Sequence, residues 1–79
     1  MTESEFIEIV EPGGDIMFDC HGKHYTILMW TDEPIYIAEQ VTEENEAEFD
    51  TIEELMNNYM IDGVPLKDRV NEIKITFRT

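Results

Sequence analysis

The hydrophobic pattern of this chain repeatedly alternates with a period of two, and this feature most constrains the fold. Side chains that alternate in this way project to opposite faces of a strand, so one face can be buried while the other meets solvent. Alternating segments predict strands at residues 15–20, 23–30, 35–39 and 73–78. Turn signals at His21-Gly22 and at 31–34 join the first three strands into an antiparallel meander.

The alternation also assigns side chains to faces. It predicts that one face of the first strand carries Ile16, Phe18 and Cys20, and that one face of the last strand carries Ile73, Ile75 and Phe77. Residues 23–30 have apolar side chains on both faces, which predicts a central strand that is covered on both sides. If helices cover only one face of the sheet, Met17, Leu28 or Trp30 lies on the open face and marks an interface.

Residues 3–11 fit either a helix or a strand. Apolar residues at i, i+3 and i+4 and a capping box formed by Thr2 and Glu5 favour a helix. Alternation over residues 7–9 would instead suit a strand. We predict a short helix, which the Pro-Gly-Gly sequence at 12–14 stops.

A second helix has stronger signals and begins at Thr51. Thr51 and Glu54 form another capping box, and the following apolar residues make a continuous helical stripe: Ile52, Leu55, Met56, Tyr59 and Met60. Asn57, Asn58 and the Asp62-Gly63 pair mark the end of this helix. Residues 65–71 predict one further helical turn before the last strand.

These elements predict an α+β fold in the order α-β-β-β-α-β. We expect a small antiparallel β-sheet, made of a three-stranded meander plus a C-terminal strand, with two helices packed on one face. A chain of 79 residues can bury about 63% of the surface that its unfolded form exposes. Residues 1–79 are therefore expected to form a single small domain with one modest core.

The charge of the chain excludes several functions. Nineteen acidic and five basic side chains give a net charge of −14, which repels phosphates and anionic lipids. We therefore expect no direct nucleic-acid binding and no membrane binding, and no apolar run approaches the ~20 residues that a spanning helix needs. The lone cysteine, Cys20, suits a reducing compartment, so we expect a cytoplasmic protein. A basic protein is the partner that this charge favours.

Cys20, His21 and His24 form a cluster of metal-ligand residue types. They could hold zinc or copper if all three pointed in one direction. The strand period argues for a structural role instead, because it places Cys20 on an apolar face and His21 in a turn. We find no phosphate-binding loop, dinucleotide fingerprint, nucleophile elbow or zinc-protease motif. We therefore expect no enzyme and no cofactor.

An acidic segment precedes the second helix. Its candidate interaction residues are Glu43, Glu44, Glu46, Glu48 and Asp50. Mutual repulsion favours an extended, solvated loop over residues 40–48, and the segment lacks the glycine and ligand spacing of an EF-hand. The functional alternative is a face that binds a basic protein.

Residues 49–68 read FDTIEELMNNYMIDGVPLKD, and Gly22-Lys23-His24-Tyr25 forms the preceding hairpin. This arrangement resembles small uncharacterised acidic bacterial proteins in which a segment of the form EELLxNYxIDGxxLxD follows a Gly-Lys-x-Tyr hairpin. The resemblance implies a bacterial single-domain protein and brings no catalytic residues with it.

Three functions fit these observations. The first is a non-catalytic protein–protein interaction module that binds a basic partner, in the manner of immunity proteins and other small inhibitors. The second is a metal-binding protein that uses the Cys20/His21/His24 hairpin. The third is a homodimeric structural subunit, and the sequence leaves open whether the chain is a monomer or a homodimer.

Overall fold

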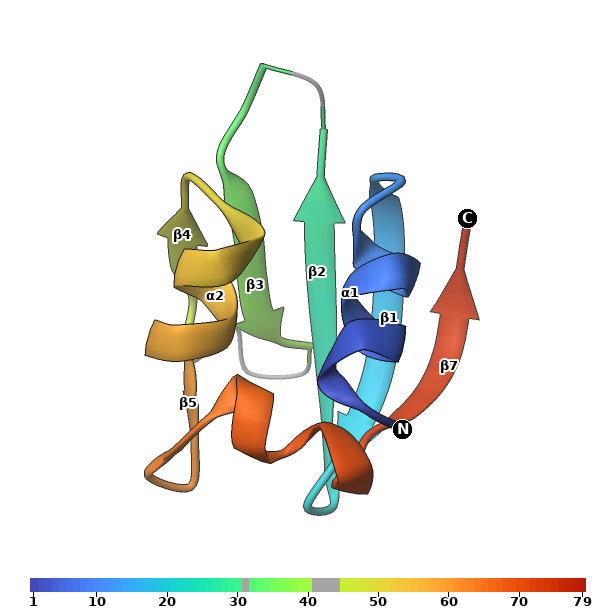
Figure 1. Cartoon of the computed structure of the whole chain (residues 1–79), viewed down its shortest axis with the longest axis vertical. Helices are drawn as coiled ribbons and strands as arrows, with labels where there is room; N and C mark the ends of the chain where they lie inside the picture. Colours follow the sequence, from blue (N-terminus) through green and yellow to red (C-terminus); the bar gives the residue numbers. More distant parts are fainter. Residues whose placement is uncertain (31, 41–44) are drawn as a thin grey trace.

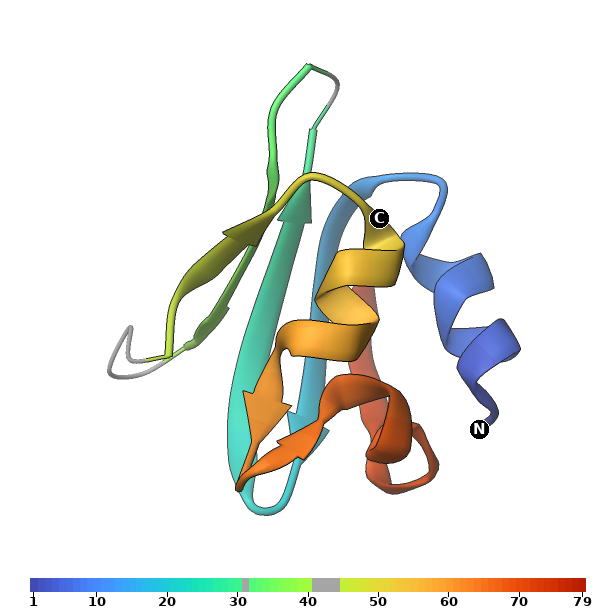
Figure 2. The ribbon, with the colours of Figure 1, turned by 60° about the vertical axis from the view of Figure 1, so that its left-hand side comes forward.

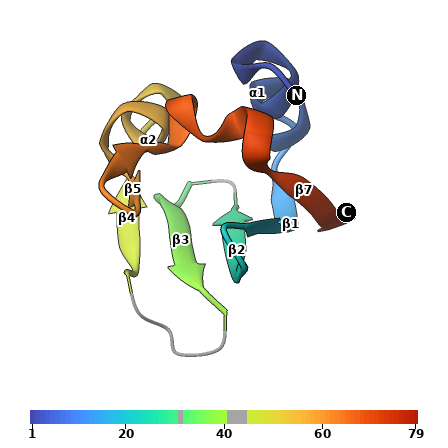
Figure 3. The same cartoon turned by 90° about the horizontal axis from the view of Figure 1, so that it is seen from below.

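The structure of the chain, a computed structural model, describes residues 1–30, 32–40 and 45–79. These residues form a five-stranded antiparallel sheet and a layer of helices that covers one of its faces (Figure 1, Figure 3). The strands follow the order β4-β3-β2-β1-β7 across the sheet. Their bounds are Gly14–Cys20 (β1), Lys23–Met29 (β2), Ile35–Glu39 (β3), Ala47–Phe49 (β4) and Lys74–Arg78 (β7). The predicted α+β fold, with the meander and the C-terminal strand in one sheet, is confirmed.

The first helix, α1 (Glu3–Val10), forms at the predicted capping box. The Thr2 side chain accepts from the Glu5 backbone N–H at 3.2 Å, and the Glu5 carboxylate accepts from the Thr2 N–H at 2.9 Å. These two bonds satisfy donors that a helix leaves unpaired at its N-terminus. Phe6 and Val10 are fully buried, so the helical interpretation of this segment is confirmed over the strand alternative.

His21 and Gly22 form the turn of the hairpin between β1 and β2. Both residues have positive φ, 52° and 75°, which is typical of the two-residue turn that matches the twist of antiparallel strands. The register places Cys20 opposite Lys23 at the turn and Ile16 opposite Ile27 further along the hairpin. This turn therefore fixes which side chains of β1 and β2 enter the core.

The second helix, α2 (Ile52–Asn58), is shorter than the sequence predicts. Thr51 caps it as expected, since its hydroxyl accepts from the Glu54 N–H at 3.1 Å. The helix ends before Met60, because the chain forms a second hairpin there, between β5 (Met60–Ile61) and β6 (Val64–Pro65). A hairpin needs extended backbone on both sides of its turn. The predicted apolar stripe is therefore wrong at Met60, whose side chain is 46% exposed.

The β5–β6 hairpin lies at the end of α2 and leads into the last part of the helix layer (Figure 2). Two short 3₁₀ turns follow it, η1 (Leu66–Asp68) and η2 (Val70–Glu72). They fulfil the prediction of a further helical turn over residues 65–71. Leu66 is fully buried, and its backbone N–H donates to the Tyr59 carbonyl at 2.8 Å. This bond ties η1 to the point where α2 ends.

The segment before α2 differs from the predicted loop. Residues 47–49 form β4, which pairs with β3 at one edge of the sheet. Ala47 and Phe49 pack against the core while Glu48 between them is exposed, so even this three-residue strand buries one face. The predicted loop over residues 40–48 is therefore wrong at its end, and residues 41–44 lie outside the described part of the chain.

The alternation in β7 is broken by a register shift opposite Met17 and Phe18. Phe18 faces Ile75, whereas Met17 faces Phe77, so Thr76 is an extra residue in β7. Residues that pair across a ladder project to the same face. Ile75 therefore packs on the core with Phe18, and Phe77 turns to the opposite face with Met17. The prediction that Ile75 and Phe77 share a face is wrong for this reason.

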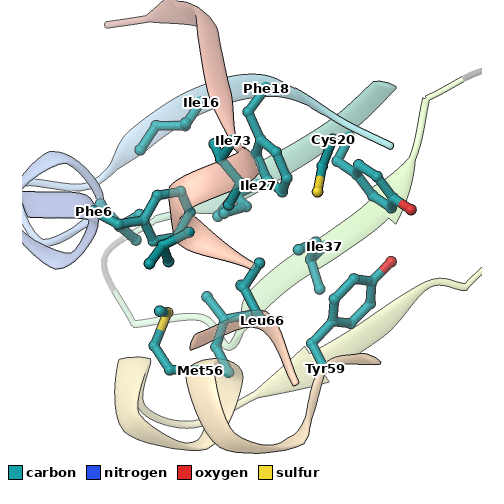
Figure 4. Close-up of a cluster of buried hydrophobic side chains, with 14 of the residues drawn as sticks. Phe6, Ile16, Phe18, Cys20, Ile27, Ile37, Met56, Tyr59, Leu66 and Ile73 are labelled. Atoms are coloured by element: carbon teal, nitrogen blue, oxygen red, sulfur yellow. The ribbon is translucent and has the colours of Figure 1, made fainter. Parts of the chain in front are cut away.

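The core lies between the sheet and the helix layer (Figure 4). Four aromatic rings cross it from α1 to the end of α2, with centroid distances of 5.7 Å for Phe6–Phe18, 5.2 Å for Phe18–Tyr25 and 6.2 Å for Tyr25–Tyr59. Leu55 and Leu66 fill the space beside them and are fully buried. Such ring pairs add about 0.5–1.5 kcal/mol each to the stabilisation from burial.

Within the described residues, the other face of the sheet has no helix over it (Figure 3). β2 is central in the strand order, as predicted, but it is covered on one side only. Tyr25 and Ile27 are buried on that side, whereas Thr26 and Leu28 on the other are partly exposed. The expected cover on both sides is therefore wrong. No helix within the described ranges is long and apolar enough to cross a membrane.

Candidate interaction surface

The hairpin residues Cys20, His21 and His24 do not converge. Cys20 is 2% exposed and lies in the core, where Figure 4 shows its sulfur among the buried side chains. His21 stands at the turn, and its ring contacts Asp62 and Glu72. His24 contacts Asp19 across the hairpin. Among the described residues, no three His, Cys, Asp or Glu side chains are grouped so that they could hold a metal ion.

Burial makes the Cys20 thiol a poor nucleophile. Desolvation is the main cause that raises the pKa of this thiol, and the nearby Glu72 carboxylate raises it further. A thiol reacts through its thiolate, so a raised pKa lowers its reactivity. Cys20 therefore acts as a small apolar side chain of the core.

His21 joins three separate segments of the chain. Its Nδ1 lies 2.9 Å from the Asp62 carboxylate in the β5–β6 turn, and its Nε2 lies 2.7 Å from the Glu72 carboxylate in η2. Arg69 completes the group, since it donates to Glu72 at 3.1 Å and to the Ile61 carbonyl at 3.1 Å. We call these residues the His21 cluster. The contacts of His21 with Asp62 and Glu72 connect the β1–β2 hairpin to the helix layer.

The His21 cluster shifts the pKa of two of its members in opposite directions. Hydrogen bonds to the Glu72 and Asp62 carboxylates raise the pKa of His21. Hydrogen bonds from His21 and Arg69 lower the pKa of Glu72. Both carboxylates stabilise the imidazolium, and the imidazolium and the Arg69 guanidinium stabilise the Glu72 carboxylate. Because these side chains pair with one another across the β1–β2 turn, the β5–β6 turn and η2, the arrangement supports the fold.

The open face of the sheet carries two rows of side chains that run across the strands. The first row joins Asp15 of β1, Leu28 of β2, Tyr36 of β3 and Glu48 of β4, which are partners in the ladder. Each of these residues alternates with a side chain that points to the core. The row therefore has Leu28 and Tyr36 at its centre and a carboxylate at each end.

The second row crosses the sheet from the opposite edge. It joins Phe77 of β7, Met17 of β1, Thr26 of β2 and Ala38 of β3, of which Ala38 is buried at 4% exposure. Phe77 is 46% exposed, and neither Phe77 nor Met17 packs against the core cluster. Trp30, which follows β2, is 58% exposed. Large exposed aromatics beside other apolar groups are typical of interaction surfaces. We call the two rows together with Trp30 the open face.

A hollow of about 310 Å³ lies at one end of the open face. Apolar and aromatic side chains form part of its wall, and two carboxylates complete it. The lining residues are Leu28, Trp30, Glu33, Pro34, Tyr36 and Glu48. They come from β2, β3, β4 and the connection between β2 and β3, so the hollow depends on the pairing of all three strands.

The candidate acidic residues are distributed around this face. Glu48 lines the hollow, and Glu46 accepts a hydrogen bond from the Tyr36 hydroxyl at 2.9 Å. Asp50 is exposed at the bend between β4 and α2. Glu43 and Glu44 lie outside the described residues. Two of the five candidates are therefore placed at the edge of the open face.

Sequence reasoning identified part of this surface. Met17, Leu28 and Trp30 were predicted to lie there if helices covered one face only, and this condition is met. Tyr36 was not singled out, although it alternates with the buried Ile35 and Ile37. Phe77 could not be found in this way, because the register shift that turns it outward leaves no sign in the alternating pattern.

No family model, no curated protein and no solved structure matches this chain. The resemblance of residues 49–68 to small acidic bacterial proteins therefore stays a prediction.

Proposed function

We propose that this protein is a non-catalytic interaction module that docks a basic partner protein on its open face. The observation that carries the proposal is the exposure of Phe77 and Trp30, 46% and 58%, on the side of the sheet that none of the described helices covers. Burial of apolar surface supplies most of the affinity of such interfaces, and Trp in particular is enriched among the residues that dominate binding.

Charge determines which partner we propose. The chain carries a net charge of −14, so a second copy would bring two strongly acidic molecules together. Like charges placed face to face cost several kcal/mol, whereas a basic surface is attracted and its association is accelerated. Glu48 on the open face and Glu46 beside it contribute to this field. A basic partner is therefore favoured over a homodimer.

The proposal includes the immunity or inhibitor-like role that the size and charge suggest, in a reducing, cytoplasmic compartment. The metal-binding alternative has less support, because Cys20 lies in the core and His24 contacts Asp19 whereas His21 contacts Asp62. The proposal assigns no reaction to the His21 cluster, whose members neutralise one another.

Site-specific photo-cross-linking tests the proposal. A photo-reactive amino acid is introduced at Phe77 and, as the control, at Met60, which is equally exposed at 46% but lies off the five-stranded sheet. We expect a cross-linked partner from position 77 in cells that is absent from position 60. The identified partner is then purified, and its binding is measured by calorimetry with the parent, Phe77→Ser and Met60→Ser proteins.

The expected result is a partner with a basic surface whose affinity falls about tenfold or more in Phe77→Ser and stays unchanged in Met60→Ser. Added salt should weaken this binding, mainly through a lower association rate. A second copy of the chain at position 77, an acidic partner, or equal cross-linking at both positions would each refute the proposal.

A further inference from the structure

We propose that the hollow lined by Trp30 and Tyr36 binds an arginine side chain of the docking partner. This inference rests on the proposed function, since it names the group that a basic partner would insert. The hollow measures about 310 Å³, which is at the lower limit of small-molecule sites, ~300–1,000 Å³. Its size therefore suits one long side chain.

The walls of the hollow fit the separate parts of an arginine. Trp30 and Tyr36 supply aromatic rings, and a guanidinium stacks on such rings through cation–π attraction. Leu28 and Pro34 supply apolar surface for the three methylene groups of the side chain. Trp30 is 58% exposed before binding, so a partner side chain can reach it.

Two carboxylates complete the lining. Glu33 comes from the connection that leads into β3, where its backbone N–H donates to the Trp30 carbonyl at 3.2 Å. Glu48 comes from β4 and stands opposite Tyr36 in the ladder. The two acids thus approach the hollow from different segments. A planar guanidinium has five donors in a fixed fork and can bond to more than one carboxylate, which a single ammonium group does less well.

None of the six lining residues is basic, and the cations of the chain lie elsewhere. Lys74 and Arg78 are on β7, which is two strands from β2, about 10 Å across the sheet. Arg69 is held in the His21 cluster. Lys23 is at the β1–β2 turn, and Lys67 is in η1 within the helix layer. The chain therefore does not supply an internal cation for Glu33 and Glu48, so an external one is favoured.

The chain offers a direct reporter for the test, because Trp30 is its single tryptophan. The indole N–H resonance is followed by two-dimensional NMR during titration with the peptide Ac-Gly-Arg-Gly-NH₂. The matched peptides carry lysine or citrulline in place of arginine. Citrulline has nearly the same shape as arginine but no charge.

We expect the arginine peptide to shift the Trp30 resonance in a saturable way, with an affinity about fivefold higher than that of the citrulline peptide. The lysine peptide should lie between them. The double variant Glu33→Gln/Glu48→Gln should lose about the same factor. The control variant Glu3→Gln/Glu53→Gln removes two exposed acids of the helix layer and should bind like the parent, since the net charge changes equally.

Equal affinity for the arginine and citrulline peptides, or an equal loss in both double variants, would overturn the inference. An unchanged backbone spectrum shows in each case that the variant is folded. The docking proposal is judged separately, by the partner that is cross-linked at position 77. If that partner binds through Phe77 while the arginine titration fails, only the assignment of the hollow is refuted.

Discussion

Replacing Leu55 by alanine should be among the most destabilising changes in this chain. Leu55 lies in the middle of α2 and is fully buried against the core. The change removes apolar contacts and leaves a cavity, because the surrounding side chains relax only partly. Substitutions of this kind cost about 2–5 kcal/mol.

This loss is a large part of the free energy of unfolding of a domain of this size. At about 0.05–0.15 kcal/mol per residue, 79 residues give a free energy of unfolding of about 4–12 kcal/mol. Each 1 kcal/mol shifts the melting temperature of such a small domain by about 4–8 °C. We therefore expect Leu55→Ala to melt at least about 8 °C below the parent, or to be partly unfolded at room temperature.

Met60→Ala is the matched control, because the sequence pattern places Leu55 and Met60 on the same helical stripe. In the structure Met60 has left the helix and is 46% exposed, so its truncation should cost no more than about 0.5 kcal/mol. Thermal unfolding followed by circular dichroism measures both changes. Equal losses in the two variants would show that the described end of α2 is wrong, and a melting temperature of Leu55→Ala within about 2 °C of the parent would show that Leu55 is not buried in the core.

Three further predictions follow from the charges and the core. The pKa of His21 is raised by Glu72 and Asp62, so its contribution to stability is complete below its ordinary value of 6.5 and is lost as the pH rises through the folded-state pKa. The pKa of Glu72 is lowered, so its contribution is lost as the pH falls through its own folded-state value. In denaturant unfolding, the stability difference between the parent and His21→Asn should thus be larger at pH 6 than at pH 8, and a constant difference would contradict the cluster. Tyr59→Phe should leave the melting temperature unchanged or raise it, because the buried Tyr59 hydroxyl has no hydrogen-bond partner among the described residues; a clear loss of stability would reveal such a partner. Raising the salt concentration from low values to about 0.1 M should increase the melting temperature, since screening within about 10 Å weakens repulsion in a chain of net charge −14. A decrease would mean that attractive ion pairs outweigh this repulsion.

Local signals were sufficient to predict most of the elements. The capping box of Thr2 and Glu5 decided between helix and strand for the first segment, because it satisfies specific backbone donors that only a helix leaves open. The turn at His21-Gly22 likewise fixed a hairpin register. Both signals act within a few residues of one another, so they are readable in a single sequence.

The differences arose where distant segments decide the structure. Met60 continues a helical spacing, but the β5–β6 hairpin requires extended backbone there. Glu48 lies in an acidic stretch that suggests a solvated loop, yet pairing with β3 makes it part of a strand. Phe77 follows a regular alternation that the extra residue Thr76 breaks. For the same reason the hollow was not predicted, since its lining is assembled only when β4 has paired with β3.

The pairing of β7 with β1 has a consequence for the chain while it is being synthesised. β7 is made after every other described strand, so the hairpin of β1 and β2 can form on the ribosome while the outer edge of β1 stays bare. Such an edge presents a row of unpaired backbone N–H and C=O groups to neighbouring chains. Closing it also requires a long loop, which slows the step relative to the formation of local hairpins. The time during which this protein can join a neighbour edge to edge thus depends on when residues 74–78 become available and on how quickly β7 then pairs with β1, and a chain that lacked these residues would leave that edge open.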